Sequence, residues 1–127
     1  MKTITITILA LLTTNIVYAE VCTGKLTKLD YFVGKSMEPT IKEGDKVYYK
    51  RTNGQYKPQT GEISILKYKG VYTGIQYEGK QADYIVHRII GKTKNKEYVT
   101  QGDNNEQQDT ETFKQEQIVG IVCKIKQ

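Results

Sequence analysis

Four side chains in this sequence are of the types from which a hydrolytic site is built. The chain has one histidine, His87, in the apolar stretch YIVHRII, and a serine, Ser36, in the turn-like segment VGKSMEPT. A serine hydroxyl is a weak nucleophile at neutral pH, and imidazole is the side chain best suited to activate it. The imidazole in turn needs a carboxylate that holds its tautomer and stabilises its cation. Asp103 and Asp109, in the segment TQGDNNEQQD, are candidates for that role.

Each of the four also has an ordinary structural interpretation. A serine in a Gly/Pro turn usually bonds the local backbone, and aspartates in loops cap turns and face water. A single histidine inside an apolar strand is more often a satisfied core side chain than a base. The set is therefore a hypothesis of a serine hydrolase, and geometry rather than order along the chain decides it.

The first nineteen residues, MKTITITILALLTTNIVYA, differ from the remainder of the chain. One lysine is followed by an apolar stretch diluted by threonines and then by Val-Tyr-Ala. This layout is typical of a secretory signal peptide, while a retained membrane anchor is the alternative, although the stretch is shorter than the roughly 20 apolar residues of a usual span. Both interpretations place the domain formed by residues 20–127 outside the cytoplasm, either attached to the membrane or exported, for example to the periplasm.

The composition bounds the fold class and the partners. The chain has 127 residues with 38% hydrophobic content, enough for one small domain. Short runs rich in Val, Ile, Thr and Tyr between turn signals predict a mainly β protein. The net charge is +5, but the lysines are scattered, so no nucleic-acid partner is expected. A weak attraction to anionic lipid headgroups is compatible with this charge.

The two cysteines lie near the two ends of the exported part. In an oxidising compartment the simplest use of Cys22 and Cys123 is one disulfide, and two unpaired buried thiols are the alternative. Two distant cysteines and one histidine do not make a zinc spacing, so no metal and no cofactor are expected.

The pattern of apolar residues and turn signals predicts a series of strands. A turn is expected over residues 36–39, and a loop with Asn-Gly, Pro and Gly over residues 52–61. The expected strands cover residues 29–33, 46–51, 62–79 as two strands meeting near Gly70, 82–91, 96–103 and 117–126.

Four segments in a fixed order resemble a known family. GKSMEPTIKEGD, GEISILKY, IVHRIIG and TQGDNN are similar to the conserved boxes of type I signal peptidases, which are membrane-associated serine proteases. The likeness runs from about Phe32 to Val122. It implies a small signal-peptidase-like β-sheet or partial barrel that cleaves signal peptides from exported precursors after small-x-small sites, at a membrane surface.

The resemblance also implies roles for individual residues. Ser36 matches the nucleophile, and His87 stands where the common bacterial branch has lysine, as in the histidine branch of archaea and the endoplasmic reticulum. Asp103 and Asp109 match the two acidic positions, and which of them is the partner of His87 stays open.

The residues around the nucleophile take further roles from the same resemblance. The backbone N–H of Ser36 would bind the oxyanion. Gly34 occupies a place where many relatives supply a hydroxyl donor, so a second donor there must be backbone or is missing. Lys35 and Met37 flank the nucleophile and are expected near the substrate or the membrane.

Other functions are compatible with the same residues. The chain lacks the large insert of many bacterial members, so a dedicated pilus or conjugation processing protease is one alternative. A second is an exported binding or assembly protein of the same fold that is inactive or needs a partner subunit. Self-cleaving repressors of the DNA-damage response share the serine motif, but they use a lysine base and commonly carry a DNA-binding region, whereas this chain has a histidine and an export signal.

Overall fold

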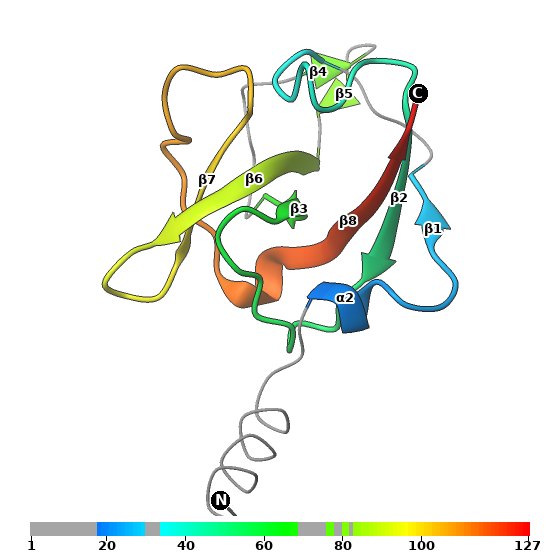
Figure 1. Ribbon diagram of the computed structural model, residues 1–127. Coiled ribbons are helices and arrows are strands. Elements are labelled where there is room, and N and C mark those ends of the chain that lie inside the picture. Colours follow the sequence, from blue (N-terminus) through cyan, green and yellow to red (C-terminus); the bar gives the residue numbers. More distant parts are fainter. Residues whose placement is uncertain (1–17, 30–33, 69–75, 78–79, 82) are drawn as a thin grey trace, which may run out of the picture.

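The structure is a computed structural model, and it describes residues 18–29, 34–68, 76–77, 80–81 and 83–127. Its main feature is one antiparallel sheet of six strands in the order β1-β2-β8-β3-β6-β7 (Figure 1). The strands are β1 (Thr27–Lys28), β2 (Lys46–Arg51), β3 (Ile63–Lys67), β6 (Tyr84–Lys92), β7 (Tyr98–Gln101) and β8 (Ile118–Lys126). A separate pair consists of β4 (Gln76–Tyr77) and β5 (Lys80–Gln81), and the helical elements are α2 (Tyr18–Val21) and the 3₁₀ turn η1 (Gln115–Gln117).

The prediction of a mainly β protein is confirmed. A strand occurs where it was expected at residues 46–51, and β3 lies in the first part of the expected range 62–79. β7 and β8 lie within the expected ranges 96–103 and 117–126, and β6 covers most of 82–91 but continues to Lys92. The strand expected at residues 29–33 is wrong in its described part, because β1 ends at Lys28 and Leu29 donates a single backbone bond to the Val47 carbonyl. Residues 30–33 and the meeting point of two strands near Gly70 lie outside the described residues.

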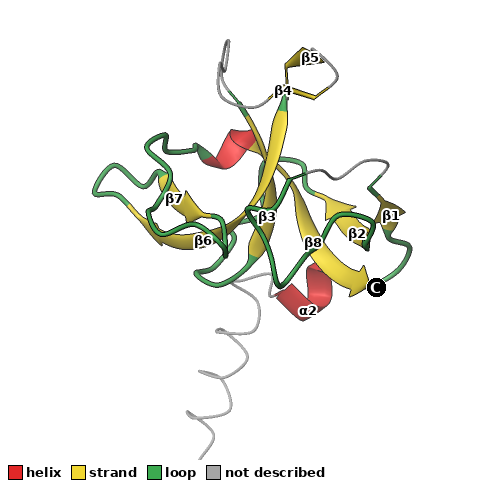
Figure 2. Cartoon of the chain, turned by 90° about the horizontal axis from the view of Figure 1, so that it is seen from above, coloured by secondary structure: helices red, strands yellow, loops and turns green. Residues whose placement is uncertain are grey.

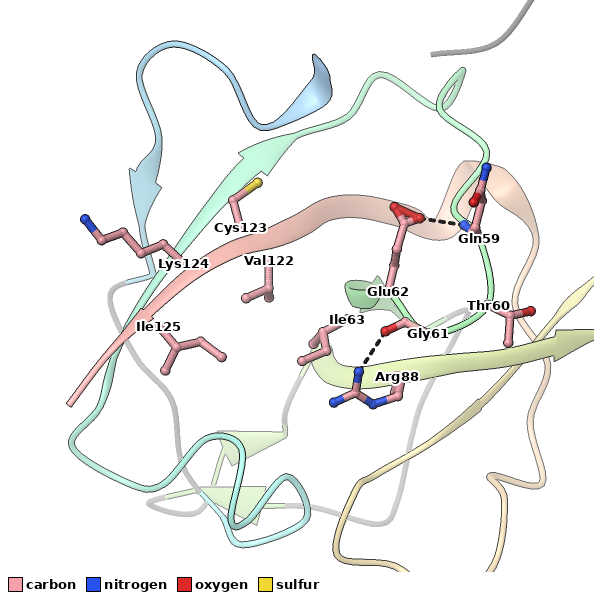
Figure 3. A pocket seen from close by; sticks show the side chains of 10 residues that line it. All are labelled: Gln59, Thr60, Gly61, Glu62, Ile63, Arg88, Val122, Cys123, Lys124 and Ile125. Atoms are coloured by element: carbon pink, nitrogen blue, oxygen red, sulfur yellow. Dashed lines mark hydrogen bonds between the residues drawn. The ribbon is translucent and has the colours of Figure 1, made fainter. Parts of the chain in front are cut away.

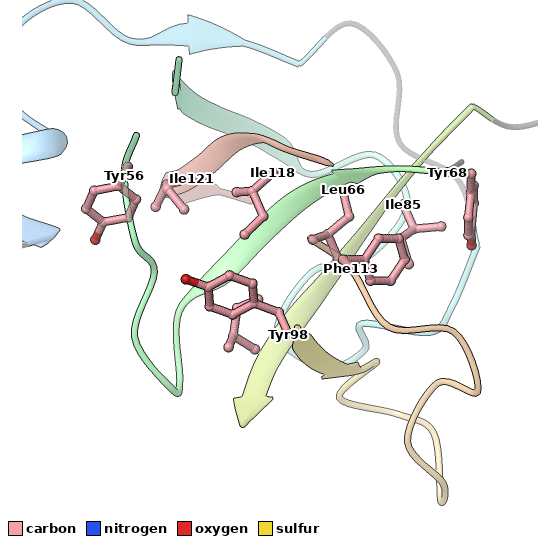
Figure 4. Close-up of a cluster of buried hydrophobic side chains, with 9 residues drawn as sticks. Tyr56, Leu66, Tyr68, Ile85, Tyr98, Phe113, Ile118 and Ile121 are labelled. Atoms are coloured by element: carbon pink, nitrogen blue, oxygen red, sulfur yellow. The ribbon is translucent and has the colours of Figure 1, made fainter. Parts of the chain in front are cut away.

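The sheet carries an apolar cluster on each face. Along β6, Ile85 and Ile89 point to one side and Val86 to the other, as the two-residue period of a strand requires. The first cluster is shown in Figure 4 and contains Tyr56, Leu66, Tyr68, Ile85, Ile89, Tyr98, Phe113, Ile118 and Ile121. The second contains Met37, Ile41, Val47, Ile65, Val86 and Val122. Because Met37 follows Ser36 directly and Ile41 comes five residues after it, the second cluster supports the segment that carries the serine.

A disulfide ties the start of the described chain to the last strand. Cys22 and Cys123 are bonded, with 5.7 Å between their Cα atoms and a sequence separation of 101. Cys123 is the extra residue of a β-bulge, since Tyr48 pairs with Lys124 while Tyr49 pairs with Val122. The bond holds α2 beside the sheet (Figures 1 and 2).

The N-terminal segment lies mostly outside the described part. Residues 1–17 are not described, so the choice between signal peptide and anchor remains an expectation. Among the residues that the structure describes, none belongs to a helix that is long and apolar enough to cross a bilayer.

Candidate active site

The segment that carries Ser36 is a compact turn. The backbone N–H of Glu38 bonds the Lys35 carbonyl at 3.1 Å, and the N–H of Ile41 bonds the Met37 carbonyl at 2.9 Å. Gly34, just before the turn, has a φ of +97°, a left-handed conformation that glycine adopts without the strain a side chain would add. The turn therefore has a defined shape, and its apolar residues fix it to the sheet.

Ser36, His87 and Asp109 form a continuous hydrogen-bonded chain. The Oγ atom of Ser36 lies 3.1 Å from Nε2 of His87, and Nδ1 of His87 lies 2.7 Å from Oδ2 of Asp109. The neutral tautomer that fits both contacts carries its proton on Nδ1, where it is donated to the carboxylate. The Nε2 lone pair then accepts the serine proton, which is the arrangement of a serine nucleophile and its base.

The histidine and its acid are both shielded from water. His87 lies on β6 with 6% of its surface exposed, and the Asp109 side chain is 19% exposed. The Thr100 hydroxyl donates to the same Asp109 Oδ2 atom at 2.6 Å, and the Asp109 N–H returns a bond to the Thr100 carbonyl at 2.8 Å. These two bonds fold the loop back on β7 and hold the carboxylate against the imidazole.

Asp103 lies in the same loop but has other partners. Its carboxylate accepts two bonds from the Arg88 guanidinium, at 2.7 Å and 2.6 Å, and one from the Thr40 hydroxyl at 2.5 Å. The bonds from Arg88, with the Thr40 hydroxyl and nearby positive charge, lower the pKa of Asp103 against the opposing effect of burial. The same bond raises the pKa of Arg88. Asp103 is thus a structural anion that joins β6 to the serine turn.

The loop after β7 and the serine turn are bonded to each other directly. The Asn104 backbone N–H donates to the Ser36 carbonyl at 2.8 Å, and its side-chain amide donates to the Lys35 carbonyl at 3.1 Å. Gly102 makes this approach possible, because a Cβ there would lie 2.6 Å from the Ser36 carbonyl oxygen and 3.0 Å from Nε2 of His87. In Figure 1 the two segments lie at the same end of the sheet, in cyan and orange.

The two residues expected at the oxyanion site, Ser36 and Gly34, differ in whether their backbone N–H groups are already hydrogen-bonded. Within the described part of the chain, no acceptor bonds the backbone N–H of Ser36. The N–H of Gly34, in contrast, donates to the Glu43 carboxylate at 2.8 Å. The expectation that Gly34 contributes to the oxyanion site therefore needs correction, because its only donor is already bonded.

The two residues that flank the nucleophile have opposite environments. Lys35 is exposed and free to approach a substrate. Met37 is fully buried in the second apolar cluster, and its sulfur accepts a bond from the Asp103 N–H at 3.4 Å. Successive side chains of the turn point in different directions. The expectation that Met37 contacts the substrate or the membrane therefore needs correction, because its side chain is buried in the core and anchors the turn instead.

A cavity of about 430 Å³ lies next to the site (Figure 3). Ile63, Val122 and Ile125 point toward it, and Arg88 lies at its edge. Neither Ser36 nor His87 lines it. The contacts between Ser36, His87 and Asp109 therefore lie outside this cavity, where the serine turn meets β6.

Sequence reasoning did not assign roles to four of the residues that build the site: Thr40, Arg88, Thr100 and Gly102. Arg88 follows His87 directly and Gly102 precedes Asp103, but adjacency alone does not reveal a contact. Thr100 gives one signal, since it is a hydroxyl residue at a buried position of a strand, where it needs an acceptor.

Comparison with known proteins gives no match. No protein-family model matches the chain, and no curated protein or solved structure is similar to it at a significant level.

Proposed function

We propose that this protein is a serine endopeptidase that uses Ser36 as nucleophile, His87 as general base and Asp109 as the acid that orients the base. The observation that carries the proposal is the unbroken chain of contacts from the Ser36 hydroxyl through both nitrogens of His87 to Asp109. A serine and a histidine that met by chance would not need a shielded carboxylate, itself held by Thr100, on the far nitrogen.

The proposed mechanism is acyl transfer. His87 takes the proton of Ser36 as the oxygen attacks a peptide carbonyl, and Asp109 stabilises the imidazolium that forms. The tetrahedral oxyanion accepts a bond from the Ser36 N–H, which has no other acceptor among the described residues. His87 then gives its proton to the leaving amine. Water, activated by the same imidazole, releases the acyl group from Ser36.

The proposed substrates are exported precursor proteins, cleaved after small-x-small sites by a signal-peptidase-like domain of the histidine branch. The resemblance of the four segments supports this choice, since all of its matched catalytic types, Ser36, His87 and the two acids, lie together in space. The disulfide supports an extracytoplasmic location, because such bonds persist in oxidising compartments. A membrane surface would then be where enzyme and precursor meet.

The proposal is tested with a peptide that spans a small-x-small site. Ser36→Ala should remove cleavage while circular dichroism and melting temperature stay close to wild type, because the change removes only a hydroxyl from a half-buried position. His87→Ala should also remove cleavage, but with a lower melting temperature, because the imidazole is buried and Asp109 loses its partner. Asp103 and Arg88 serve as the internal contrast, since their variants should lose stability. Equal cleavage by wild type and Ser36→Ala would rule out the serine mechanism.

The same assay addresses the alternative of an inactive exported binding protein. Such a protein would bind the peptide without cleaving it, and Ser36→Ala would leave the affinity unchanged. Binding without cleavage by folded wild-type protein, in detergent and in lipid vesicles, would replace the protease proposal with this one.

A further inference from the structure

Four lysines gather on one face of the sheet, where β1, β2 and β8 lie side by side. Tyr48 of β2 pairs with Lys28 of β1 on one side and with Lys124 of β8 on the other, and Lys46 pairs with Lys126. Directly paired residues of antiparallel strands share a face, and residues two apart along a strand do the same. Lys28, Lys46, Lys124 and Lys126 are all exposed, and we call them the lysine face.

The charge of the lysine face is not balanced by the protein. Within the described part of the chain the ion pairs are His87–Asp109 and Arg88–Asp103, and neither involves these lysines. Lys46 and Lys126 stand directly opposite each other, and like charges in that position destabilise a sheet. An anionic partner would relieve this repulsion.

The lysine face points away from the apolar cluster under the serine turn. The alternate residues of the same strands, Val47 and Ile125, pack in or against the cluster that contains Met37 and Ile41. Figure 3 shows Lys124 and Ile125 leaving β8 in opposite directions. A partner on the lysine face would therefore leave the serine turn uncovered.

The lysine face adjoins the place where the N-terminal apolar sequence enters the domain. Lys50, two residues beyond Tyr48 on β2, donates from Nζ to the carbonyls of Thr23 and Lys25 at 3.1 Å and 3.3 Å. Cys22 is bonded to Cys123, the neighbour of Lys124. Only a few residues separate this point from the uncharged stretch Thr3–Ala19 of the sequence.

We propose that the lysine face binds the anionic headgroups of a lipid bilayer. In a chain that retains the apolar stretch Thr3–Ala19, that stretch favours lipid over other polyanions, because a nucleic acid or an acidic protein would offer it no apolar phase. Two weak attachments, one basic and one apolar, together hold a domain to a membrane far better than either does alone. The proposal deepens the proposed function, since it says which side of the protease meets the membrane, but its test does not depend on cleavage.

The test is cosedimentation of the full-length chain with vesicles of phosphatidylcholine alone and of phosphatidylcholine mixed with phosphatidylglycerol. Wild type should prefer the anionic vesicles at low salt, and the preference should weaken as salt is raised. Lys46→Gln/Lys124→Gln/Lys126→Gln should reduce the preference roughly five-fold per lysine, on the order of 100-fold in all. The matched control, Lys57→Gln/Lys67→Gln/Lys94→Gln, removes the same charge at exposed positions elsewhere. It should retain most of the preference for anionic vesicles.

Several results would overturn the proposal. If the two triple variants lost the preference for anionic vesicles equally, the binding would be an effect of net charge and not of the lysine face. If wild type bound both kinds of vesicle equally, the anionic headgroups would have no role. Tighter binding to single-stranded DNA than to anionic vesicles would assign the face to nucleic acid. Cleavage of a soluble peptide without lipid should be unchanged in the lysine-face variant, so a failed membrane proposal and a failed protease proposal give different results.

Discussion

At the scale of single residues, the two acids of the loop after β7 have separate tasks. Asp109 contacts the imidazole of His87 at 2.7 Å and also accepts the Thr100 hydroxyl, so its charge is directed at the base. Asp103 directs its charge at Arg88 and Thr40. The two carboxylates lie six positions apart in the sequence. Removal of the Asp109 carboxylate should lower the activity, whereas removal of the Asp103 carboxylate should lower the stability of the fold.

Asp109→Asn should lower kcat by about 10⁴-fold with little change in KM or melting temperature. An amide in place of the carboxylate no longer stabilises the imidazolium and favours the wrong tautomer, and about this loss is typical of the equivalent change in serine proteases. Steady-state kinetics on a peptide substrate measure it. A loss of less than ten-fold would remove Asp109 from the catalytic group.

Ser64 makes a prediction about stability. It is fully buried on β3, its Cα atom is paired with that of His87, and its hydroxyl is the buried side-chain polar atom that lacks a hydrogen-bond partner among the described residues. Burial without a partner costs about 1–3 kcal/mol, so Ser64→Ala should unfold at a higher temperature than wild type. Thermal melts check this, with Ser64→Thr, which keeps the hydroxyl, as the control. A lower melting temperature for Ser64→Ala would show that the hydroxyl has a stabilising contact.

The types of the site residues could be predicted from the sequence better than their contacts could. Ser36, His87 and an aspartate are predictable as a set, because serine hydrolysis requires those chemical groups. The choice between Asp103 and Asp109 depends on the path of the loop, which the backbone bond from Asp109 to Thr100 determines. Met37 was misplaced for a related reason, because a neighbour of the nucleophile in sequence points into the core in space.

At the scale of elements, the site joins three segments that are distant in the chain. The serine turn, β6 and the loop after β7 meet through Arg88, Asp103 and Asn104. Strands such as β2 and β8 were predictable because alternation and runs of β-branched residues have a direct structural meaning. Their order in the sheet was not, since pairing between distant strands leaves no local pattern.

The contact between Asp103 and Arg88 predicts a pH dependence of stability. Because the pKa of Asp103 is lowered in the folded protein, its contribution is complete above the unfolded value of about 3.9. The contribution is lost as the pH falls through the lower, folded value. Asp103→Asn should cost about 1–2 kcal/mol at neutral pH, because Arg88 is partly exposed, and almost nothing in strong acid.

Urea unfolding of wild type and Asp103→Asn at a series of pH values measures this difference. Glu106→Gln is the control, since Glu106 is an exposed acid in the same loop. A difference between wild type and Asp103→Asn that stayed constant from neutral pH into strong acid would contradict an ionic role for Asp103.

At the scale of the whole molecule, one covalent bond closes nearly the entire domain. The Cys22–Cys123 bond spans 101 residues and connects the entry of the chain to its last strand. Two faces of the sheet then serve different purposes in this account. One supports the serine turn through Met37 and Ile41. The other carries the lysine face, for which we propose a membrane partner.

Reduction of the disulfide should destabilise the protein strongly. A loop of this length corresponds to about 4–5 kcal/mol in the chain-entropy view, which is roughly 15–20 °C in melting temperature for a domain of this size. Melting curves with and without reductant measure the change, and Cys22→Ala/Cys123→Ala should reproduce it in the absence of reductant. A melting temperature that reductant leaves unaltered would show that the sheet needs no such closure.

The central claim is that Ser36 cleaves peptides with the help of His87 and Asp109. The most direct measurement is the incubation of an exported precursor carrying a small-x-small site with wild type and with Ser36→Ala, followed by mass spectrometry of the new N-terminus. We expect one cut, directly after the second small residue, by wild type alone. Cleavage by both proteins, or by neither when both are folded and a lipid surface is supplied, would contradict it.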